Sequence, residues 1–182
     1  MQYFSDIDYR QSQQKKRLAP KIPQGGGGYP EGENTIDTER IRAYLLTLPH
    51  VVETVQFGGL VFWVGDKAIG GKMFAWMRLE QNESRTRVIS FAAGPERYAE
   101  LLEIDGIFPA PYVARIFWVA VERWNVFRAP EWEQELRAAH NLTLNKLPQR
   151  VRGILAMPAT PQKRLIADRK KLLAARKASK KT

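Results

Sequence analysis

The chain has no cysteine and only two histidines among its 182 residues. The absence of cysteine excludes disulfide bonds, thiolate metal sites and cysteine nucleophiles. The two histidines, His50 and His140, are far apart in the sequence, and common catalytic metal sites draw on several histidine, cysteine or carboxylate ligands. We therefore expect neither a bound metal ion nor a cofactor.

Long hydrophobic runs are also missing. No apolar stretch approaches the roughly 18 residues of a membrane span, and residues 1–34 lack the apolar segment of a secretory signal. Residues 1–34 are polar and include consecutive glycines at 25–28, a composition that cannot offset the entropy lost on ordering. We expect a cytoplasmic protein with a disordered N-terminal arm over residues 1–34.

Positive charge is abundant but unevenly distributed. The formal net charge is +10, yet residues 161–182 alone hold nine basic residues and one acidic residue. Residues 1–34 and residues 35–160 each carry a net charge of only +1. The high isoelectric point therefore belongs to a basic tail over residues 159–182 and not to the domain expected over residues 35–158.

Apolar spacing and turn residues predict the secondary structure of that domain. Asp37 is the expected N-cap of a first helix, which Pro49 closes. The expected helices cover residues 37–48, 95–103 and 131–147, the expected strands cover 60–64, 73–79, 88–91 and 116–121, and a short helical turn covers 151–155. This order predicts an α+β fold, in which helices pack on an antiparallel sheet.

Five segments in this order resemble one protein family. They are DTERIRAYLL at 37–46 with Leu48-Pro49, LVFWVGDKAIGGKMFA at 60–75, FAAGPER at 91–97, PAPYVAR at 109–115 running into Trp118-Val119, and KLP at 146–148. Over roughly residues 37–156, the chain resembles the MmcQ/YjbR family. The resemblance implies a fold similar to bacterial frataxin (CyaY) and a DNA-binding function with a double wing of hairpins as the contact surface. The two tails lie outside the resemblance.

One strand combines basic and aromatic residues. Alternation along the expected strand at 73–79 and its start places four of them on one face: Lys72, Phe74, Trp76 and Arg78. In the next strand, Arg85 and Arg87 are two residues apart and are therefore expected on one face. Such a face can hold phosphates and stack bases. The alternative is that the cations meet water at the strand ends while the aromatic rings fill the core.

The loop with Gly70, Gly71 and Lys72 is a candidate wing tip, which would contact phosphate through backbone N–H groups and an ammonium. It is not a nucleotide-binding P-loop, because Met73 follows the lysine. The alternative is a plain tight hairpin. The family pattern has a basic residue at the position of Arg115, so the resemblance marks Arg115 as a contact; alternatively, Arg115 pairs with a surface carboxylate.

No pattern points to catalysis. Serines such as Ser90 have no neighbouring G-x-S-x-G motif, and His140 falls within an expected helix, where a packed or surface histidine is commoner than a catalytic one. Iron binding of the frataxin kind would need a ridge of carboxylates, whereas Glu131, Glu133 and Glu135 point in different directions from their helix. We expect a non-enzyme.

The C-terminal tail is the clearest electrostatic feature. Its candidate contact residues are Lys163, Arg164, Arg169, Lys170 and Lys171. Leu165-Ile166 recurs seven residues later as Leu172-Leu173, which predicts an amphipathic basic helix over 164–177. Such a helix would neutralise phosphates and bind with steep salt dependence and no sequence preference. The alternatives are an anionic membrane surface, for which the tail lacks aromatic anchors, and a solvated tail without specific function.

The leading hypothesis is therefore a monomeric DNA-binding protein whose affinity is non-specific and sensitive to salt. Its rival is a non-enzymatic protein-interaction domain that docks a protein partner. The positions of five basic residues in the fold discriminate between these hypotheses. If the five cluster, DNA binding is favoured; if they are dispersed, the rival or a tail that acts alone is favoured. They are Lys72, Arg78, Arg85, Arg87 and Arg115.

Overall fold

The computed structural model describes residues 37–78 and 87–179. In chain order the main elements are α2 (Thr38–Thr47), β1 (Val51–Gln56), β2 (Gly59–Val64), β3 (Lys72–Arg78), β4 (Ile89–Ala92), α3 (Pro95–Leu102), β5 (Ile107–Pro109), β6 (Trp118–Val121), α4 (Ala129–Asn145), α5 (Gln149–Leu155) and α6 (Ala159–Ser179). Short 3₁₀ helices lie between them: η1 (Lys67–Ile69), η2 (Ala114–Ile116) and η3 (Trp124–Val126). The expected arm over 1–34 and the candidate Arg85 lie outside the described residues.

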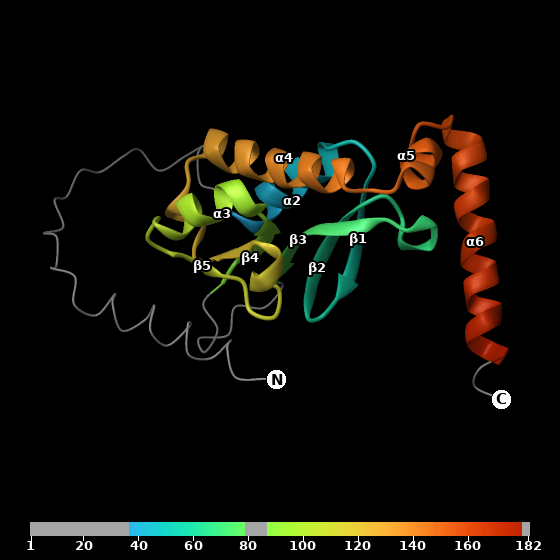
Figure 1. The fold of residues 1–182 in the computed structure, drawn as a ribbon, viewed down its shortest axis with the longest axis horizontal. Helices are drawn as coiled ribbons and strands as arrows, with labels where there is room; N and C mark the ends of the chain where they lie inside the picture. The colour runs from blue at the N-terminus through green and yellow to red at the C-terminus, as the bar shows by residue number, and fades with distance from the viewer. Residues whose placement is uncertain (1–36, 79–86, 180–182) are drawn as a thin grey trace, which may run out of the picture.

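Within this described part, the strands form one antiparallel sheet in the order β1-β2-β3-β4-β6-β5. Helices α2, α3 and α4 lie over one face of the sheet (Figure 1). The expected α+β class is confirmed. Two strands, β1 and β5, were not expected from the sequence. β5 has only three residues, and β1 joins β2 through Phe57-Gly58, a turn with positive φ at both residues that lacks the usual Asn-Gly or Asp-Gly signal.

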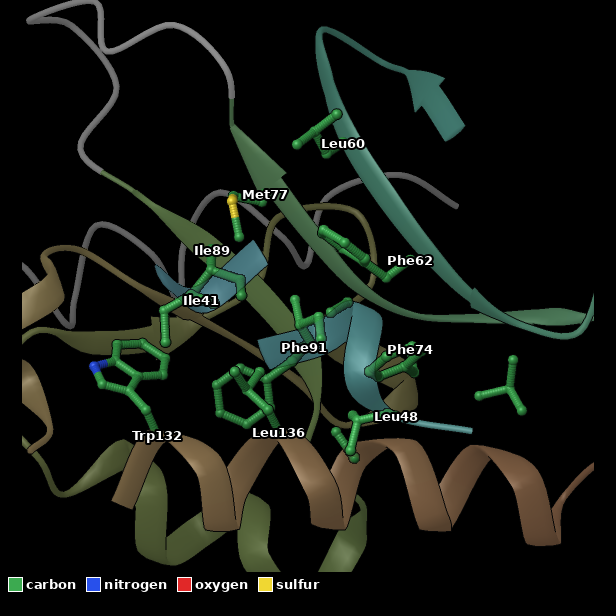
Figure 2. Packing of buried hydrophobic residues seen from close by; sticks show 14 of the residues in the cluster. Ile41, Leu48, Leu60, Phe62, Phe74, Met77, Ile89, Phe91, Trp132 and Leu136 are labelled. Atoms are coloured by element: carbon green, nitrogen blue, oxygen red, sulfur yellow. The ribbon is translucent and has the colours of Figure 1, made fainter. Parts of the chain in front are cut away.

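The hydrophobic core lies between the helices and the sheet. Trp132 and Leu136 project from α4 toward Phe91 of β4 and Phe74 of β3, and Ile41 of α2 closes one side (Figure 2). All five side chains are buried. Each contributes roughly 1.5–3 kcal/mol to stability through burial. The faces of α2 and α4 that were expected to point inward are thus the faces that pack on the sheet.

Side chains fix the beginnings of two helices. The carboxylate of Asp37 accepts a hydrogen bond from the Arg40 amide at 2.8 Å, which confirms its N-cap role in α2. Helix α4 begins before the expected residue 131, because the Glu131 carboxylate accepts a hydrogen bond from the Arg128 amide at 2.8 Å. Hydrogen bonds from the Arg128 side chain and backbone also lower the pKa of Glu131 below its ordinary value.

Helix α6 contains most of the basic tail and is docked on the domain. The Gln162 side chain donates hydrogen bonds to the carbonyl oxygens of Ile154 and Leu155 at 3.0 and 3.2 Å, which closes the end of α5. Leu165 and Ile166 pack against the core. The first turns of α6 are thus part of the folded domain.

The second half of α6 makes different contacts. Lys170 Nζ lies 2.6 Å from Asp66 Oδ2, next to η1, and Figure 1 shows α6 standing at this end of the domain. Beyond this ion pair, Leu172 and Leu173 are 58% and 50% exposed. The expected apolar stripe therefore meets the domain only through its first pair of residues. No helix of the described ranges is long and apolar enough to cross a membrane.

Candidate nucleic-acid surfaces

The pairing of β2 with β3 contains an irregularity that changes the facing of side chains. Met73 and Ala75 are registered with consecutive residues of β2, so Phe74 is an extra residue on β3. A β-bulge of this kind interrupts the alternation of side chains along a strand. Phe74 consequently lies on the helix side of the sheet, where its ring centroid is 5.4 Å from that of His140.

The expected single face with four basic and aromatic residues is therefore wrong. Lys72 and Phe74 belong to the helix side, and Lys72 Nζ donates a hydrogen bond to the carbonyl oxygen of Lys146 at the end of α4, at 3.2 Å. Trp76 and Arg78 lie on the opposite face, since Met77 between them is in the core. The bulge separates one pair from the other.

A second irregularity occurs where β4 begins. The Val88 amide donates a hydrogen bond to the Val121 carbonyl oxygen at 2.9 Å, although Ile89 is the residue registered with Val121. Both Val88 and Ile89 are consequently buried in the core. Arg87 is directed to the opposite face, where its guanidinium carbon lies 4.6 Å from the ring centroid of Trp76.

The face away from α2, α3 and α4 has two halves. Over β5 and β6, Phe108 and Trp118 are buried and Val113 from the loop before η2 packs on them. Over β1 to β3, two indoles remain half-buried, and the Lys67 ammonium lies 4.7 Å from the ring centroid of one of them, Trp63. We name this second half the indole face; it consists of Trp63, Lys67, Trp76, Arg78 and Arg87.

The candidate wing tip is a closed turn rather than an open loop. The Gly70 amide donates to the Lys67 carbonyl at 3.1 Å, and the Gly71 amide donates to the Asp66 carbonyl at 3.0 Å. Helix α6 packs against this turn. The two amides are engaged within the turn and are not available to a phosphate, so the expected contact through backbone N–H groups is wrong. The Lys72 side chain, in contrast, is exposed.

Four other arginines of the body are held by carboxylates. The pairs, with their shortest distances, are Arg42–Glu53 at 2.7 Å, Arg97–Glu135 at 2.6 Å, Arg123–Asp105 at 2.7 Å and Arg128–Glu131 at 2.6 Å. The hydrogen bonds that Arg42 and Arg97 donate to Glu53 and Glu135, respectively, raise the pKa of each arginine above its ordinary value. The small net charge of the body thus reflects cations neutralised within the domain.

The five body cations proposed as contacts do not form one cluster. Arg115 is exposed in η2, shortly before Trp118, which is registered with the last residue of β4. Arg87, in contrast, precedes the first residue of β4. Arg78 and Arg87 share the indole face. Lys72 and Arg115 lie toward the other end of the strands. Arg85 lies outside the described residues.

Helix α6 carries the largest group of cations without carboxylate partners. In the described part of the chain, six of them are exposed and form no ion pair: Lys163, Arg164, Arg169, Lys171, Arg176 and Lys177. Lys170 differs, because Asp66 holds it. Four of the five tail residues predicted as contacts therefore present free charge, and the fifth helps to fix the helix.

The domain that contains this sheet is similar to known proteins. The family model described as YjbR matches residues 46–142, just over half of the chain. The chain belongs to the YjbR family. Among solved structures, it is similar to the Deinococcus radiodurans protein DR2400, which has the DUF419 domain of this same family. That similarity has 28% sequence identity and a TM-score of 0.57, and it covers 66% of this chain and 88% of the other. No curated protein matches the chain.

The YjbR match covers both bulges and the indole face but ends within α4, before α5 and α6. Two members of the indole face, Trp63 and Lys67, were not among the expected contact residues. The position of Trp63 could have been predicted from the alternation of β2. Phe62 and Val64 face the core, so Trp63 between them must face away. Lys67 comes from η1, whose position no periodicity predicts.

The histidine singled out in the sequence has a packing role. His140 is fully buried, and its Nε2–H donates a hydrogen bond to the carbonyl oxygen of Pro49 at 2.8 Å. Of the packed and surface positions expected for this histidine, the structure shows the packed one. Within residues 37–78 and 87–179, no group of three or more histidine, aspartate or glutamate residues could hold a metal ion.

Proposed function

We propose that this YjbR-family chain binds DNA without sequence preference, mainly through α6. One observation carries the proposal: six exposed cations without ion pairs among the described residues lie on one helix whose orientation the domain fixes. Phosphate contacts by such cations release condensed counterions, which supplies affinity without reading bases. A role in binding rather than catalysis is part of the same proposal.

The docking of α6 determines how phosphates can be reached. The stripe with Gln162, Leu165, Ile166 and Lys170 faces the domain, so the cations on the remaining sides face outward. A helix of 21 residues is about 31 Å long. Because duplex DNA carries one charge per about 1.7 Å of axis, the helix is long enough to contact several phosphates at once. The body has a secondary role, since carboxylates hold four of its arginines.

A charge-neutralised α6 tests this proposal. We expect the combined variant Arg169→Gln, Lys171→Gln, Arg176→Gln and Lys177→Gln to bind a duplex at least about tenfold more weakly at low salt. The slope of log K against log salt should fall in magnitude by up to about 3.6, because each of the four lost phosphate contacts lowers it by about 0.9. Fluorescence anisotropy across a salt series measures both quantities. Truncation is less suitable, since it would remove Leu165 and Ile166 from the core.

The matched control neutralises four exposed cations of the body: Arg115→Gln, Lys146→Gln, Arg150→Gln and Arg152→Gln. It changes the net charge by the same amount, and we expect only a small loss of affinity. An equal loss in both variants would show that total charge and not α6 determines binding. An unchanged affinity of the α6 variant would contradict the proposal.

A second candidate function is supported by the segment around η2. Tyr112, Ile116 and Phe117 are 90%, 52% and 41% exposed, and Tyr112 and Phe117 have positive φ angles of 68° and 61°. Exposed apolar side chains on a strained loop are typical of protein-interaction surfaces. If the full chain fails to bind DNA at low salt, a protein-interaction domain becomes the favoured reading, and Ile116→Ser is the variant to compare in a search for partners.

A further inference from the structure

The indole face has a geometry suited to flat ligands. The Trp76 Nε1–H donates to the carbonyl oxygen of Gln56 in β1 at 3.4 Å, so this indole reaches across β2. It passes directly over Gly59, where a Cβ would lie 2.9 Å from Trp76 Nε1. The Trp63 Nε1–H is also fixed from β1, by Thr54 Oγ1 at 2.9 Å. Both rings are therefore held by β1 across the sheet surface.

Each of these rings has a cation over one of its faces. Arg87 lies 4.6 Å from the Trp76 ring centroid, and Lys67 lies 4.7 Å from that of Trp63. Lys67 Nζ also donates to Gln56 Oε1 at 3.0 Å, which fixes its position. Aromatic rings next to cations are the combination with which proteins hold single-stranded nucleic acid, because rings stack on bases while cations contact the backbone.

Two polar atoms on the same side of the sheet point to a ligand more directly. Ser90, which is registered with Trp76, is only 4% exposed, and its Oγ has no hydrogen-bond partner among the described residues. The Nη1 of Arg78 is likewise buried and without a partner there. Buried donors without partners are costly in a folded protein, and oxygens of a bound phosphate or base would satisfy them.

We propose that the indole face binds a single strand of DNA, with bases stacked on Trp63 and Trp76 and strand oxygens held by Arg78. The inference rests on the proposed function and adds a strand preference to it. In a duplex, base faces are covered by neighbouring bases and are not accessible to an indole. α6 supplies affinity for either form of DNA, whereas the indole face favours single strands.

The test compares oligothymidylate of about 20 nucleotides with a duplex of the same length on the full chain. For the wild type we expect tighter binding of the single strand, accompanied by quenching of tryptophan fluorescence. Trp76→Leu should weaken single-strand binding about tenfold, reduce the quenching and leave duplex binding unchanged. Trp76→Phe, which retains a ring, should restore most of the lost affinity. Tyr112→Leu removes an exposed aromatic ring elsewhere and serves as the matched control.

Trp63→Leu is the second variant in case Trp76→Leu does not fold, and thermal denaturation monitors folding of both. Equal losses on single strand and duplex, or no loss in either folded variant, would overturn the inference while leaving the α6 proposal intact. Equal losses with Tyr112→Leu would also overturn it. If the wild type binds neither DNA, the proposed function fails and this inference fails with it.

Discussion

Replacement of Gly71 by alanine is expected to lower the free energy of unfolding by about 4 kcal/mol or more. A Cβ at this position would lie 1.9 Å from the carbonyl oxygen of Gly65 and 2.9 Å from that of Val64. Both contacts are with backbone atoms, which cannot rotate away as a flexible side chain can. The turn between β2 and β3 would have to open, and α6 is docked on this turn. Urea denaturation followed by tryptophan fluorescence measures the change.

Gly153 provides the control for this substitution. It lies in α5, and a Cβ at this position meets nothing within 4 Å. Gly153→Ala should therefore increase stability by roughly 0.5–1 kcal/mol, because alanine loses less backbone entropy in a helix. If Gly71→Ala stays within about 1 kcal/mol of the wild type, the two strands do not approach each other as closely as described.

The second large effect concerns Arg97 in the FAAGPER segment. Its guanidinium donates to Glu135 Oε1 from Nε at 3.1 Å and from Nη2 at 2.6 Å, and the side chain of Glu135 is only 8% exposed. Arg97→Met would leave a buried carboxylate without its cation. Because Arg97 itself is 43% exposed, we expect a loss of about 2–3 kcal/mol rather than the 3–5 typical of deeply buried pairs. Urea denaturation again provides the measurement.

The double variant Arg97→Met and Glu135→Leu separates the ion pair from the packing of the two side chains. Removing both charges eliminates the uncompensated carboxylate, so the double variant should be more stable than Arg97→Met alone. A double variant that is less stable than the single would show that the Glu135 carboxylate has a further partner. This pair joins α3 to α4.

Much of the fold could be predicted because local signals agreed with it. Asp37, Pro49 and the apolar spacing between them define α2, and turn formers after Val64 define the hairpin that leads to β3. The facing of β3 could not be predicted, since a bulge at Phe74 depends on how β2 is registered against it. Strict alternation gave the wrong face for Lys72 and Phe74 for that reason.

The candidate site was predictable in its charges but not in its arrangement. The basic residues of the tail are evident in the sequence, and four of the five predicted there are exposed and unpaired among the described residues. The contact of Lys170 with Asp66 joins residues far apart in the chain, and no local pattern indicates it. The same holds for the approach of Lys67 to Trp63, which depends on the closed turn at η1.

The ends of the sheet bear on how copies of this chain meet one another. An edge strand with free backbone groups invites pairing with a second sheet. At one edge, β5 has three residues and ends in Pro109, which has no amide hydrogen to donate. At the other, Glu53 of β1 is bound by Arg42 at 2.7 and 3.0 Å, and a strand added there would have to desolvate this ion pair. Edge-to-edge association is therefore disfavoured on both sides, by a missing donor on one and a charge on the other.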